Sequence, residues 1–559
     1  MRMLRVVVAT GSAVVVCGAL ATPAVAVKGP HRPLQAELRA SAAQPSGALG
    51  GNVAVSGDTM VVAAPDTTVD GQPNEGAVYV YTKPKSGWAN ATQRAVLTLP
   101  VVPFSPRSGA AVAVSGNTIV VGAPFESVGG TYQQGVAYVF SKPKSGWAST
   151  SDPTATLSAS DGSTESFFGT SVAVSGGTIV VGEVGQGPHS AAYVFAKPRG
   201  DWVSSTQTAK LTGSLNTSSD GFGHSVAISG GTAVVGAPDQ PKGAADDTGM
   251  GYVFVKPTGG WTDATETRRL VASHPIQGAA FGSDLAMSGG TVVVGAPGDV
   301  LDDPVTTAGS IDVFTRPRAG WGQPSQAPLM QTAALTARGG SKSDGFGTSV
   351  AVSGGRIAAG LPTYSATKSA GRGVLDLYDQ PVKGWRNMAQ SGQLTASNGK
   401  AGDEFGAAVA LTGSTVDVGA PDAGPQSGSD PAAGAAYVFS LAMPQLGKLK
   451  QSHSAWVVGT RKPAVNPKHV PKGGTRFGFR LNEPATVTLV FAKKRGSHFG
   501  SAHPLTVAGR QGSNRVYVDG PLSGKARLAA GRYRVEVRAT NAAGETTAVK
   551  TLHFRTRRH

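Results

Sequence analysis

The chain of 559 residues is longer than a single hydrophobic core usually organises, so its length predicts several domains or an array of repeats. With 77 glycines, 36 prolines and only 6% aromatic residues, the composition suits short strands joined by many turns and argues against a mainly helical protein. The net charge of +16 is concentrated from Leu441 onward, where 22 Lys and Arg stand against 4 Asp and Glu, so we expect two bodies of opposite charge.

The N-terminus has the pattern of an export signal. Arg2 and Arg5 precede an apolar run, and Ala24-Val25-Ala26 supplies a small-x-small cleavage site. The run is too short to cross a hydrocarbon core of ~30 Å, so we expect residues 1–26 to be a signal peptide rather than a membrane anchor. The only cysteine, Cys17, lies within it. The mature protein is therefore expected to lack disulfides and to be secreted or extracellular, either free or associated with the cell envelope.

One sequence unit recurs seven times after this signal. In its fourth copy the unit reads Phe222-Gly223, an apolar run, Ser229-Gly230, a second apolar run, Gly236-Ala237-Pro238, Tyr252-Val253-Phe254 and Gly260-Trp261. The glycine of the Phe-Gly position recurs about every 59 residues, at Gly50, Gly109, Gly169, Gly223, Gly282, Gly347 and Gly406. Self-similar units of this size, each with four short apolar runs between turns, predict the four-stranded blades of a β-propeller.

Distances within the unit separate a fixed frame from adjustable loops. A leucine of the fourth-strand run precedes the motif glycine by 12 residues in every copy, as Leu270 precedes Gly282. That glycine precedes the end of the Gly-Ala-Pro run by 15 residues in every copy, as with Pro297. The length between this run and the third strand varies from 9 residues in copy three to 16 in copy seven. The connections between strands two and three are therefore expected to be adjustable loops.

On these motifs the chain resembles the FG-GAP repeat family, the repeat that also builds the propeller of integrin α-subunits. The resemblance implies an all-β fold with a seven-bladed propeller, which we place at residues 27–445. Leu49, Ser108 and Glu183-Val184 depart from the motif, and copy seven lacks the tryptophan. A fourth-strand sequence, Leu38 to Ser41, stands before the first full copy, while copy seven ends after its third strand. We therefore expect the N-terminal strand to complete the last blade.

Two aromatic positions of the unit are predicted to have packing roles. The tryptophans that follow a Pro-x-x-Gly turn are expected to cap the outer strands, with a lectin-like aromatic surface as the alternative. The phenylalanines that precede the motif glycine are expected to wedge between blades: Phe168, Phe222, Phe281, Phe346 and Phe405.

Metal and catalytic chemistry find little support in the sequence. Integrin-type FG-GAP units often carry an Asp-rich calcium loop between strands one and two, whereas here this turn is Ser-Gly-x-Thr, with Asp58 as its sole carboxylate. No His-x-x-Glu, His-x-x-x-His or Gly-x-Ser-x-Gly motif is present. We therefore expect no cofactor, no metal site and no catalytic residues. Arg199-Gly200-Asp201 spells an integrin-ligand tripeptide, but it occupies an ordinary turn of the repeat and is interpreted as a coincidence.

The chain ends in a strongly basic module. Residues 446–474 contain several prolines and are interpreted as a linker. Residues 475–559 resemble an Ig-like or fibronectin-type β-sandwich. Its charge predicts a tether to an anionic cell-envelope polymer. The alternatives are binding to phospholipid or a charged surface that is merely solvated. A specific nucleic acid partner is not expected, because no aromatic-basic stacking motif accompanies the charge. The strands predicted in this module are Thr475 to Leu481, Ala485 to Phe491, Arg515 to Val518, Tyr533 to Arg538 and Thr547 to Phe554.

The sequence thus predicts a non-enzymatic binding or adhesion scaffold at the cell surface, with an extracellular protein or glycan as its ligand. Two other functions remain open. A lectin-like propeller of the cell envelope would show exposed aromatic side chains recurring on one rim. An unrecognised hydrolase would show acids and histidines converging on the central channel.

The ligand-binding surface is predicted on the face where the two-to-three connections emerge. These loops vary in length and chemistry, and loops on a rigid scaffold are where binding function concentrates. Solvent loops without a binding role are the alternative interpretation. The candidate ligand-binding residues form a mixed acidic and aromatic rim: Asp70, Glu75, Tyr132, Asp246, Asp247, Asp302, Asp303 and Tyr364.

Overall fold

A computed structural model describes residues 34–558 except 43, 86, 101–110, 186–189, 216–219, 241–247, 274–275, 300–308, 323–326, 338–343, 365–370, 425–431, 442–444, 468–472, 482–484, 511, 523–525, 541–546 and 548. The described residues form strands and turns, and none of them lies in a helix. The same residues therefore include no helix long and apolar enough to cross a membrane. The predicted signal peptide, residues 1–26, lies outside the described residues.

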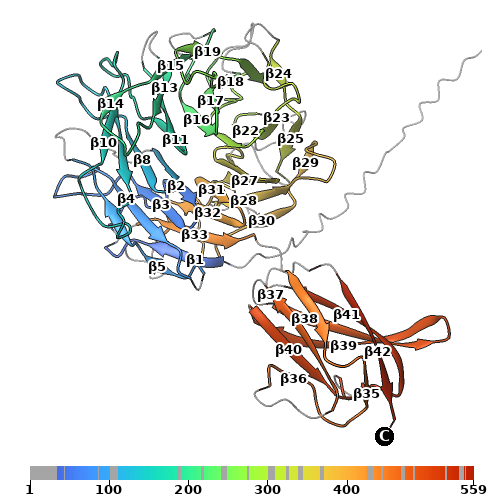
Figure 1. Cartoon of the computed structure of the whole chain (residues 1–559). Coiled ribbons are helices and arrows are strands. Elements are labelled where there is room, and N and C mark those ends of the chain that lie inside the picture. The colour runs from blue at the N-terminus through green and yellow to red at the C-terminus, as the bar shows by residue number, and fades with distance from the viewer. Residues whose placement is uncertain are drawn as a thin grey trace, which may run out of the picture.

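Seven antiparallel sheets, each with four main strands, form the blades of a propeller (Figure 1). Blades one to three contain β2 (Asn52–Ser56), β3 (Thr59–Ala64), β4 (Ala77–Thr82) and β6 (Ala95–Leu97); β7 (Ala111–Ser115), β8 (Thr118–Ala123), β9 (Val136–Ser141) and β10 (Ala155–Ser158); β11 (Ser171–Ser175), β12 (Thr178–Glu183), β13 (Ala191–Ala196) and β15 (Ala209–Thr212). Blades four and five contain β16 (Ser225–Ser229), β17 (Thr232–Ala237), β18 (Met250–Val255) and β20 (Arg268–Val271); β21 (Leu285–Ser288), β22 (Thr291–Ala296), β23 (Ser310–Thr315) and β25 (Ala333–Thr336). Blades six and seven contain β26 (Val350–Ser353), β27 (Arg356–Leu361), β28 (Val374–Asp379) and β30 (Gly392–Leu394); β31 (Ala408–Thr412), β32 (Thr415–Ala420), β33 (Ala435–Ser440) and β1 (Leu34–Arg39).

The central strands of each blade are apolar along almost their whole length. All six residues of β3 are buried, and so are all six of β8. A blade is covered on both faces by its neighbours, and strands buried on both faces read as continuous apolar runs rather than as alternating ones. The seven repeats therefore form one ring of stacked sheets, and the predicted all-β propeller is confirmed.

Close contacts between glycines of neighbouring blades explain why the repeat needs both of its motif glycines. A Cβ atom on Gly122 would lie 2.0 Å from the carbonyl oxygen of Gly169 in the next blade. Gly169 has a φ of 98°, and a Cβ atom there would lie 2.5 Å from the carbonyl oxygen of Val136. Because only glycine allows this approach, the motif encodes the seams between blades. The same contact recurs between Gly182 and Gly223, Gly236 and Gly282, Gly295 and Gly347, Gly360 and Gly406, and Gly419 and Gly50.

The five motif phenylalanines are buried beside these glycines. Phe168 packs edge-to-face against Tyr193 and Phe195, with ring centroids 5.4 and 6.0 Å apart. Its cluster includes side chains of blades two and three, so the ring fills the seam. Such aromatic pairs add about 0.5–1.5 kcal/mol beyond the area that they bury. The prediction that these phenylalanines wedge between blades is confirmed.

The N-terminal strand closes the ring. β1 pairs antiparallel with β33, and Leu38 lies opposite Ala436. Figure 1 shows the blue strand β1 beside the orange strand β33, from the far end of the repeat array. Blade seven is therefore completed by a strand from the other end of the propeller, which confirms the expected closure and leaves no open edge between the first and last blades.

Two-residue strands lock neighbouring blades together at their outer edges, a feature that sequence analysis missed. Each pairs in parallel with the fourth strand of the preceding blade. The tryptophans of the repeat stand just before these strands and are all buried, so they cap the outer strands as predicted and supply no exposed aromatic surface. The outer strands are β5 (Ala91–Thr92), β14 (Ser205–Thr206), β19 (Ala264–Thr265), β24 (Leu329–Met330) and β29 (Met388–Ala389).

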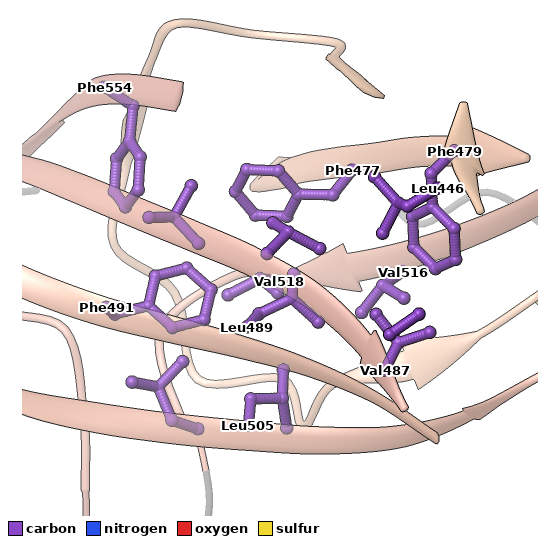
Figure 2. Close-up of a cluster of buried hydrophobic side chains, with 14 of the residues drawn as sticks. Leu446, Phe477, Phe479, Val487, Leu489, Phe491, Leu505, Val516, Val518 and Phe554 are labelled. Carbon is purple, nitrogen blue, oxygen red and sulfur yellow. The ribbon is translucent and has the colours of Figure 1, made fainter. Parts of the chain in front are cut away.

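The C-terminal part folds as a β-sandwich of two sheets with a shared apolar core. One sheet has the order β34-β37-β40-β36 and the other β35-β42-β41-β38-β39. Figure 2 shows this core, in which Phe477 of one sheet and Phe491 of the other meet edge-to-face at 5.8 Å. The strands are β34 (Leu446–Gln451), β35 (Ala455–Val457), β36 (Ala464–Val465), β37 (Thr475–Leu481), β38 (Ala485–Arg495), β39 (His498–Gly509), β40 (Gly512–Val518), β41 (Gly531–Thr540) and β42 (Lys550–Arg557).

One prediction about this module is wrong, and one strand was missed. The segment 446–474 is not a linker, because β34, β35 and β36 pair with β37, β42 and β40. Leu446 and Trp456 of this segment are buried in the sandwich core. The strand β39 was not predicted at all: it is an edge strand with Pro504 and exposed polar residues, so it lacks the apolar run of a buried strand. Whether the sandwich is specifically Ig-like stays a prediction.

Candidate functional site

A hollow opens on the propeller axis at the start of the innermost strands. It has a volume of about 320 Å³, and residues from all seven blades line it. The lining residues follow the motif glycine of each repeat by one to three positions, because the chain turns at that glycine into the innermost strand. The polar lining side chains include Asn52, Thr170, Ser171, His224, Ser225, Asp284, Thr348 and Ser349.

Several hydroxyl groups of this lining hold neighbouring blades together. The Oγ atoms of Ser171, Ser225 and Ser349 each donate a hydrogen bond of 2.7 Å to the motif-glycine carbonyl of the next blade. A hydroxyl engaged in this way is not free to act as a nucleophile in the same geometry. These serines therefore belong to the frame of the hollow.

Asp284 takes the place of this serine in blade five. Its carboxylate accepts hydrogen bonds from the backbone N–H of Val350 at 2.6 Å and of Leu285 at 2.9 Å, so it also joins two blades. Desolvation raises the pKa of Asp284 to about 7, although the two N–H donors act in the opposite direction. The hollow thus contains a carboxyl group that changes charge near neutral pH.

His224, from blade four, lines the same hollow and is exposed. Its Nδ1 atom lies 3.1 Å from the carbonyl oxygen of Ser283, the residue before Asp284. A carbonyl oxygen only accepts, so Nδ1 carries the proton in this contact and Nε2 is left as an acceptor. The hydroxyl of Ser283 donates to the carbonyl of Ala280. Nε2 of His224 is thus left as an acceptor beside the hollow, while the carboxylate of Asp284 and the hydroxyl of Ser283 are engaged with the scaffold.

The two-to-three loops emerge on the same face as this hollow. In blade two, the carbonyl of Tyr132 accepts a hydrogen bond of 2.9 Å from the N–H of Glu165, and the carbonyl of Gln134 accepts one of 2.9 Å from Phe168. Phe168 directly precedes the motif glycine and the innermost strand of blade three. In blade two, the loop that was predicted to bind ligand thus lies on the face of the axial hollow, and its end contacts the segment that leads into the hollow.

The structure describes four of the eight predicted rim residues, and their exposure differs. Asp70 is exposed in the loop of blade one, and Tyr132, with 51% of its surface accessible, is exposed in the loop of blade two. Tyr364 is half-buried and packs against the core between blades five and six. The remaining candidates, Asp246, Asp247, Asp302 and Asp303, lie outside the described residues.

The prediction that Glu75 faces solvent on the rim is wrong. Only 9% of its surface is accessible, and this burial raises its pKa. Glu126 of blade two is buried too, and accepts a hydrogen bond of 2.5 Å from the hydroxyl of Tyr138. Burial raises the pKa of Glu126 to about 7, and the charge of Glu75 adds to this effect despite the Tyr138 hydrogen bond. The two acids belong to the seam between blades rather than to the ligand surface.

A further buried acid marks blade three, where the motif is broken. Glu183 stands where five other blades have alanine, and 1% of its surface is accessible. The hydroxyl of Tyr193 lies 3.0 Å from Asp161 and 3.4 Å from Glu183, while Lys210 pairs with Asp161. Burial raises the pKa of Glu183 to about 8, with a further increase from the charge of Asp161. This cluster is a network of the seam between blades two and three.

The Arg-Gly-Asp tripeptide lies in a three-to-four turn, away from the face of the hollow. The carboxylate of Asp201 accepts hydrogen bonds from the Ser141 hydroxyl at 2.6 Å and the Trp202 N–H at 2.8 Å, and it pairs with Lys197 at 3.4 Å. The Ser141 hydrogen bond is the main cause that lowers its pKa. The aspartate is engaged by its own scaffold.

The described residues contain no group of three or more His, Cys, Asp or Glu side chains placed to hold a metal ion. Sequence analysis missed His224 and Asp284 because no motif links them. The signal that would have found them is their register: both lie within two residues of a motif glycine, at Gly223 and Gly282.

Comparison with known proteins identifies the repeat. The family model for the FG-GAP repeat matches residues 34–81, 92–140, 152–195, 205–254, 264–314, 329–373 and 388–439. No curated protein matches the chain significantly. Among solved structures, the chain is 14% identical to a periplasmic gluconolactonase of Pseudomonas aeruginosa, covering 63% of this chain and 86% of that one with a TM-score of 0.38. The β-propeller domain of the trilobed protease of Pyrococcus furiosus is 8% identical over 66% of this chain and 88% of that one, with a TM-score of 0.32. These low values carry no conclusion about function.

Proposed function

The chain belongs to the FG-GAP repeat family, and from this premise we propose that it is an exported, non-enzymatic binding or adhesion scaffold whose propeller binds an extracellular protein or glycan. The observation that carries the proposal is the axial hollow, which residues from all seven blades line and which opens on the face of the two-to-three loops. Binding surfaces on propellers are built from loops held by a rigid frame. The basic C-terminal sandwich is proposed to tether the protein to an anionic polymer of the cell envelope.

The rigidity of the frame supports this proposal. Glycine contacts join the seams, β1 closes the ring, and the outer two-residue strands tie each blade to the preceding one. A preorganised scaffold loses little conformational entropy when a ligand binds. The described residues of the hollow combine hydroxyl, amide, imidazole and carboxyl groups, which suit hydrogen bonds to a polar ligand.

Two alternative functions have specific support of different strength. The polar lining and the exposed ring of Tyr132 favour a carbohydrate ligand, since sugars are recognised by hydrogen bonds together with aromatic faces. The convergence of His224 and Asp284 on the axis favours a hydrolase. Against hydrolysis, Asp284 is engaged with two backbone N–H groups, and the hydroxyl of Ser283 donates to a carbonyl.

The first experiment identifies the ligand. The mature full-length chain is applied to an array of glycans and extracellular matrix proteins, and a hit is measured as a dissociation constant. The variant Tyr132→Ser should weaken that binding roughly tenfold if the loop face is used. Val382→Ser is the matched control, because Val382 is a fully exposed apolar side chain in a three-to-four turn on the opposite face.

The second experiment tests the location. The two-to-three loops of blades one, four and five are shortened to the length of the loop in blade three. Binding should be lost while the unfolding midpoint changes little, because the deletions remove the middle of each loop and keep the loop ends that pack in the seams. Undiminished binding in this variant would move the site to the opposite face or to the basic sandwich. Turnover of a chromogenic ester or glycoside that disappears in His224→Ala would instead support the hydrolase.

A further inference from the structure

A second hollow lies on the C-terminal sandwich and is rich in cationic groups. It has a volume of about 460 Å³, and its lining includes Lys494, Phe499, Arg532, His553 and Arg555. These residues come from β38, β39, β41 and β42, which are adjacent strands of one sheet. The hollow therefore sits on one sheet of a module whose sequence is strongly basic.

The strand register places the cations on the outer face of this sheet. Tyr533 and Phe554 lie opposite each other, are buried, and stack with centroids 5.2 Å apart and planes 7° apart. Side chains alternate along a strand, so their neighbours project to the other side. On that side Arg532 lies opposite Arg555, and Arg534 lies opposite His553.

The pairing of Arg532 with Arg555 is unfavourable without a partner. Like charges directly opposite each other on neighbouring strands destabilise a sheet. Among the described residues no ion pair neutralises Lys494, Arg532 or Arg555; the pair in this sheet is that of Arg534 with Glu536, whose atoms Nε and Oε1 are 3.1 Å apart. An anion placed between Arg532 and Arg555 would remove their repulsion and occupy two guanidinium forks at once.

Arg534 is held in place beside this pair. Its guanidinium lies 4.5 Å from the centre of the Phe499 ring, and the Phe499 and His553 rings are 6.1 Å apart. A cation on an aromatic face is an orienting contact. The Arg534 guanidinium also covers the face of Phe499 on which a nucleobase would stack. The arrangement therefore favours a ligand that presents anionic groups over single-stranded nucleic acid, which binds by base stacking.

We propose that this cationic hollow, lined by Lys494, Arg532, His553 and Arg555 with Arg534 beside it, is a specific binding site for an acidic polysaccharide, with Arg532 and Arg555 receiving its carboxylate or phosphate groups. The inference rests on the proposed tether and names its location and its ligand. The charge of the module then acts through one sheet face rather than through the whole surface.

The test compares two double variants of the full-length chain. R532Q/R555Q removes two charges from the hollow, and R480Q/R515Q removes two exposed charges from the opposite sheet. The probes are polygalacturonate as a carboxylate glycan, a phosphomannan as a phosphate glycan, and single-stranded DNA of matched charge. R532Q/R555Q should weaken glycan binding roughly tenfold or more, because two charge-assisted contacts are lost. The control should weaken it less than about threefold, since only the general field changes.

Several outcomes would overturn this site. Equal losses in the two double variants would mean that binding follows net charge alone, and binding by neither glycan would remove the proposed ligand. Preference for DNA, abolished by R532Q/R555Q, would assign the hollow to nucleic acid. The free R532Q/R555Q protein should melt at the same temperature as wild type or slightly above it, which excludes misfolding as the cause. The array ligand of the propeller should bind both variants normally, so failure of this site and failure of the propeller proposal are distinguishable.

Discussion

A buried aspartate in blade seven gives the sharpest test of how the propeller is stabilised. Asp417, in β32, has 0% of its surface accessible, and neither carboxyl oxygen has a hydrogen-bond partner among the described residues. Its cross-strand neighbours Ala410 and Val438 belong to the apolar seam between blades seven and one, with Met60 and Val62 of blade one. The equivalent position in the other six blades is apolar: Val61, Val120, Val180, Val234, Val293 and Ala358.

Asp417→Val should therefore stabilise the propeller. Leaving a polar group buried without a partner costs about 1–3 kcal/mol. Burying a valine side chain contributes about 1.5–3 kcal/mol, and valine suits a buried strand. Allowing for imperfect fit of the added methyl groups, the free energy of unfolding at neutral pH should rise by about 3 kcal/mol. Guanidinium unfolding of the full-length chain, followed by fluorescence of the buried tryptophans, measures this change.

The pH dependence provides a second readout with a definite sign. Burial raises the pKa of Asp417 well above its usual value, whereas in the unfolded chain it is about 3.9. Below that unfolded pKa the carboxyl is neutral in both states. As the pH rises above it, the unfolded state ionises and the folded state does not, so wild type loses up to about 1.4 kcal/mol per pH unit until the folded pKa is reached.

The advantage of Asp417→Val should accordingly be smallest below pH 4, where only the unpartnered carboxyl and the packing of valine contribute, and should grow as the pH rises. Asp417→Asn is the matched control, because it keeps a polar side chain but removes the titration. It should flatten the pH dependence without the full gain in stability. A valine variant that is less stable than wild type, or one whose advantage does not change between acid and neutral pH, would refute the reasoning.

Two further perturbations test the seams. Gly122→Ala should lower the midpoint of thermal unfolding by several degrees or prevent folding, because its Cβ would lie 2.0 Å from the Gly169 carbonyl. Gly392→Ala is the control for loss of a strand glycine, because its Cβ would meet open space and its φ is not positive; equal effects of the two variants would show that the seam contact is unimportant. Glu183→Ala restores the usual motif residue and removes a carboxyl whose pKa burial raises to about 8. The variant should therefore gain stability relative to wild type as the pH rises from about 4 to 8, which urea unfolding at several pH values measures. A constant difference in the free energy of unfolding across that range would contradict the assignment.

The repeat frame was predictable because its constraints are steric and recur seven times. A glycine that must accept close backbone contact cannot be replaced, so Gly50 to Gly406 mark the seams even in a single sequence. The closing strand was predictable for a related reason: Leu38 has a repeat position but no unit of its own. The linker prediction failed because β34 reads Leu-Gly-Lys-Leu-Lys-Gln, and lysine and glycine have low β-propensity. This segment forms a strand because it pairs with β37.

The axial hollow could not be found from sequence motifs. Its residues come from seven strands that are far apart in the chain, and no local spacing links His224 to Asp284. The departure of one repeat from the others is the accessible signal: serine occupies the position of Asp284 in blades three, four and six. An aspartate in place of a serine that joins two blades indicates that the lining differs at this blade. That the position lies on the propeller axis follows only from the assembled ring.

The error at Glu75 shows which parts of the loops are available to a ligand. A glycine precedes the third strand in blade one, two, four, five, six and seven, and these glycines have positive φ angles. In blade two, a Cβ on Gly135 would lie 2.1 Å from the carbonyl oxygen of Phe168, so the end of the loop is fixed in the seam. Glu75, Gln134 and Thr248, which directly precede this glycine in blades one, two and four, are buried. By contrast, Asp70 and Tyr132 in the middle of their loops are exposed. In blades one and two we therefore expect the proposed ligand contacts to come from the middle of the two-to-three loop, while the loop ends maintain the spacing of the blades.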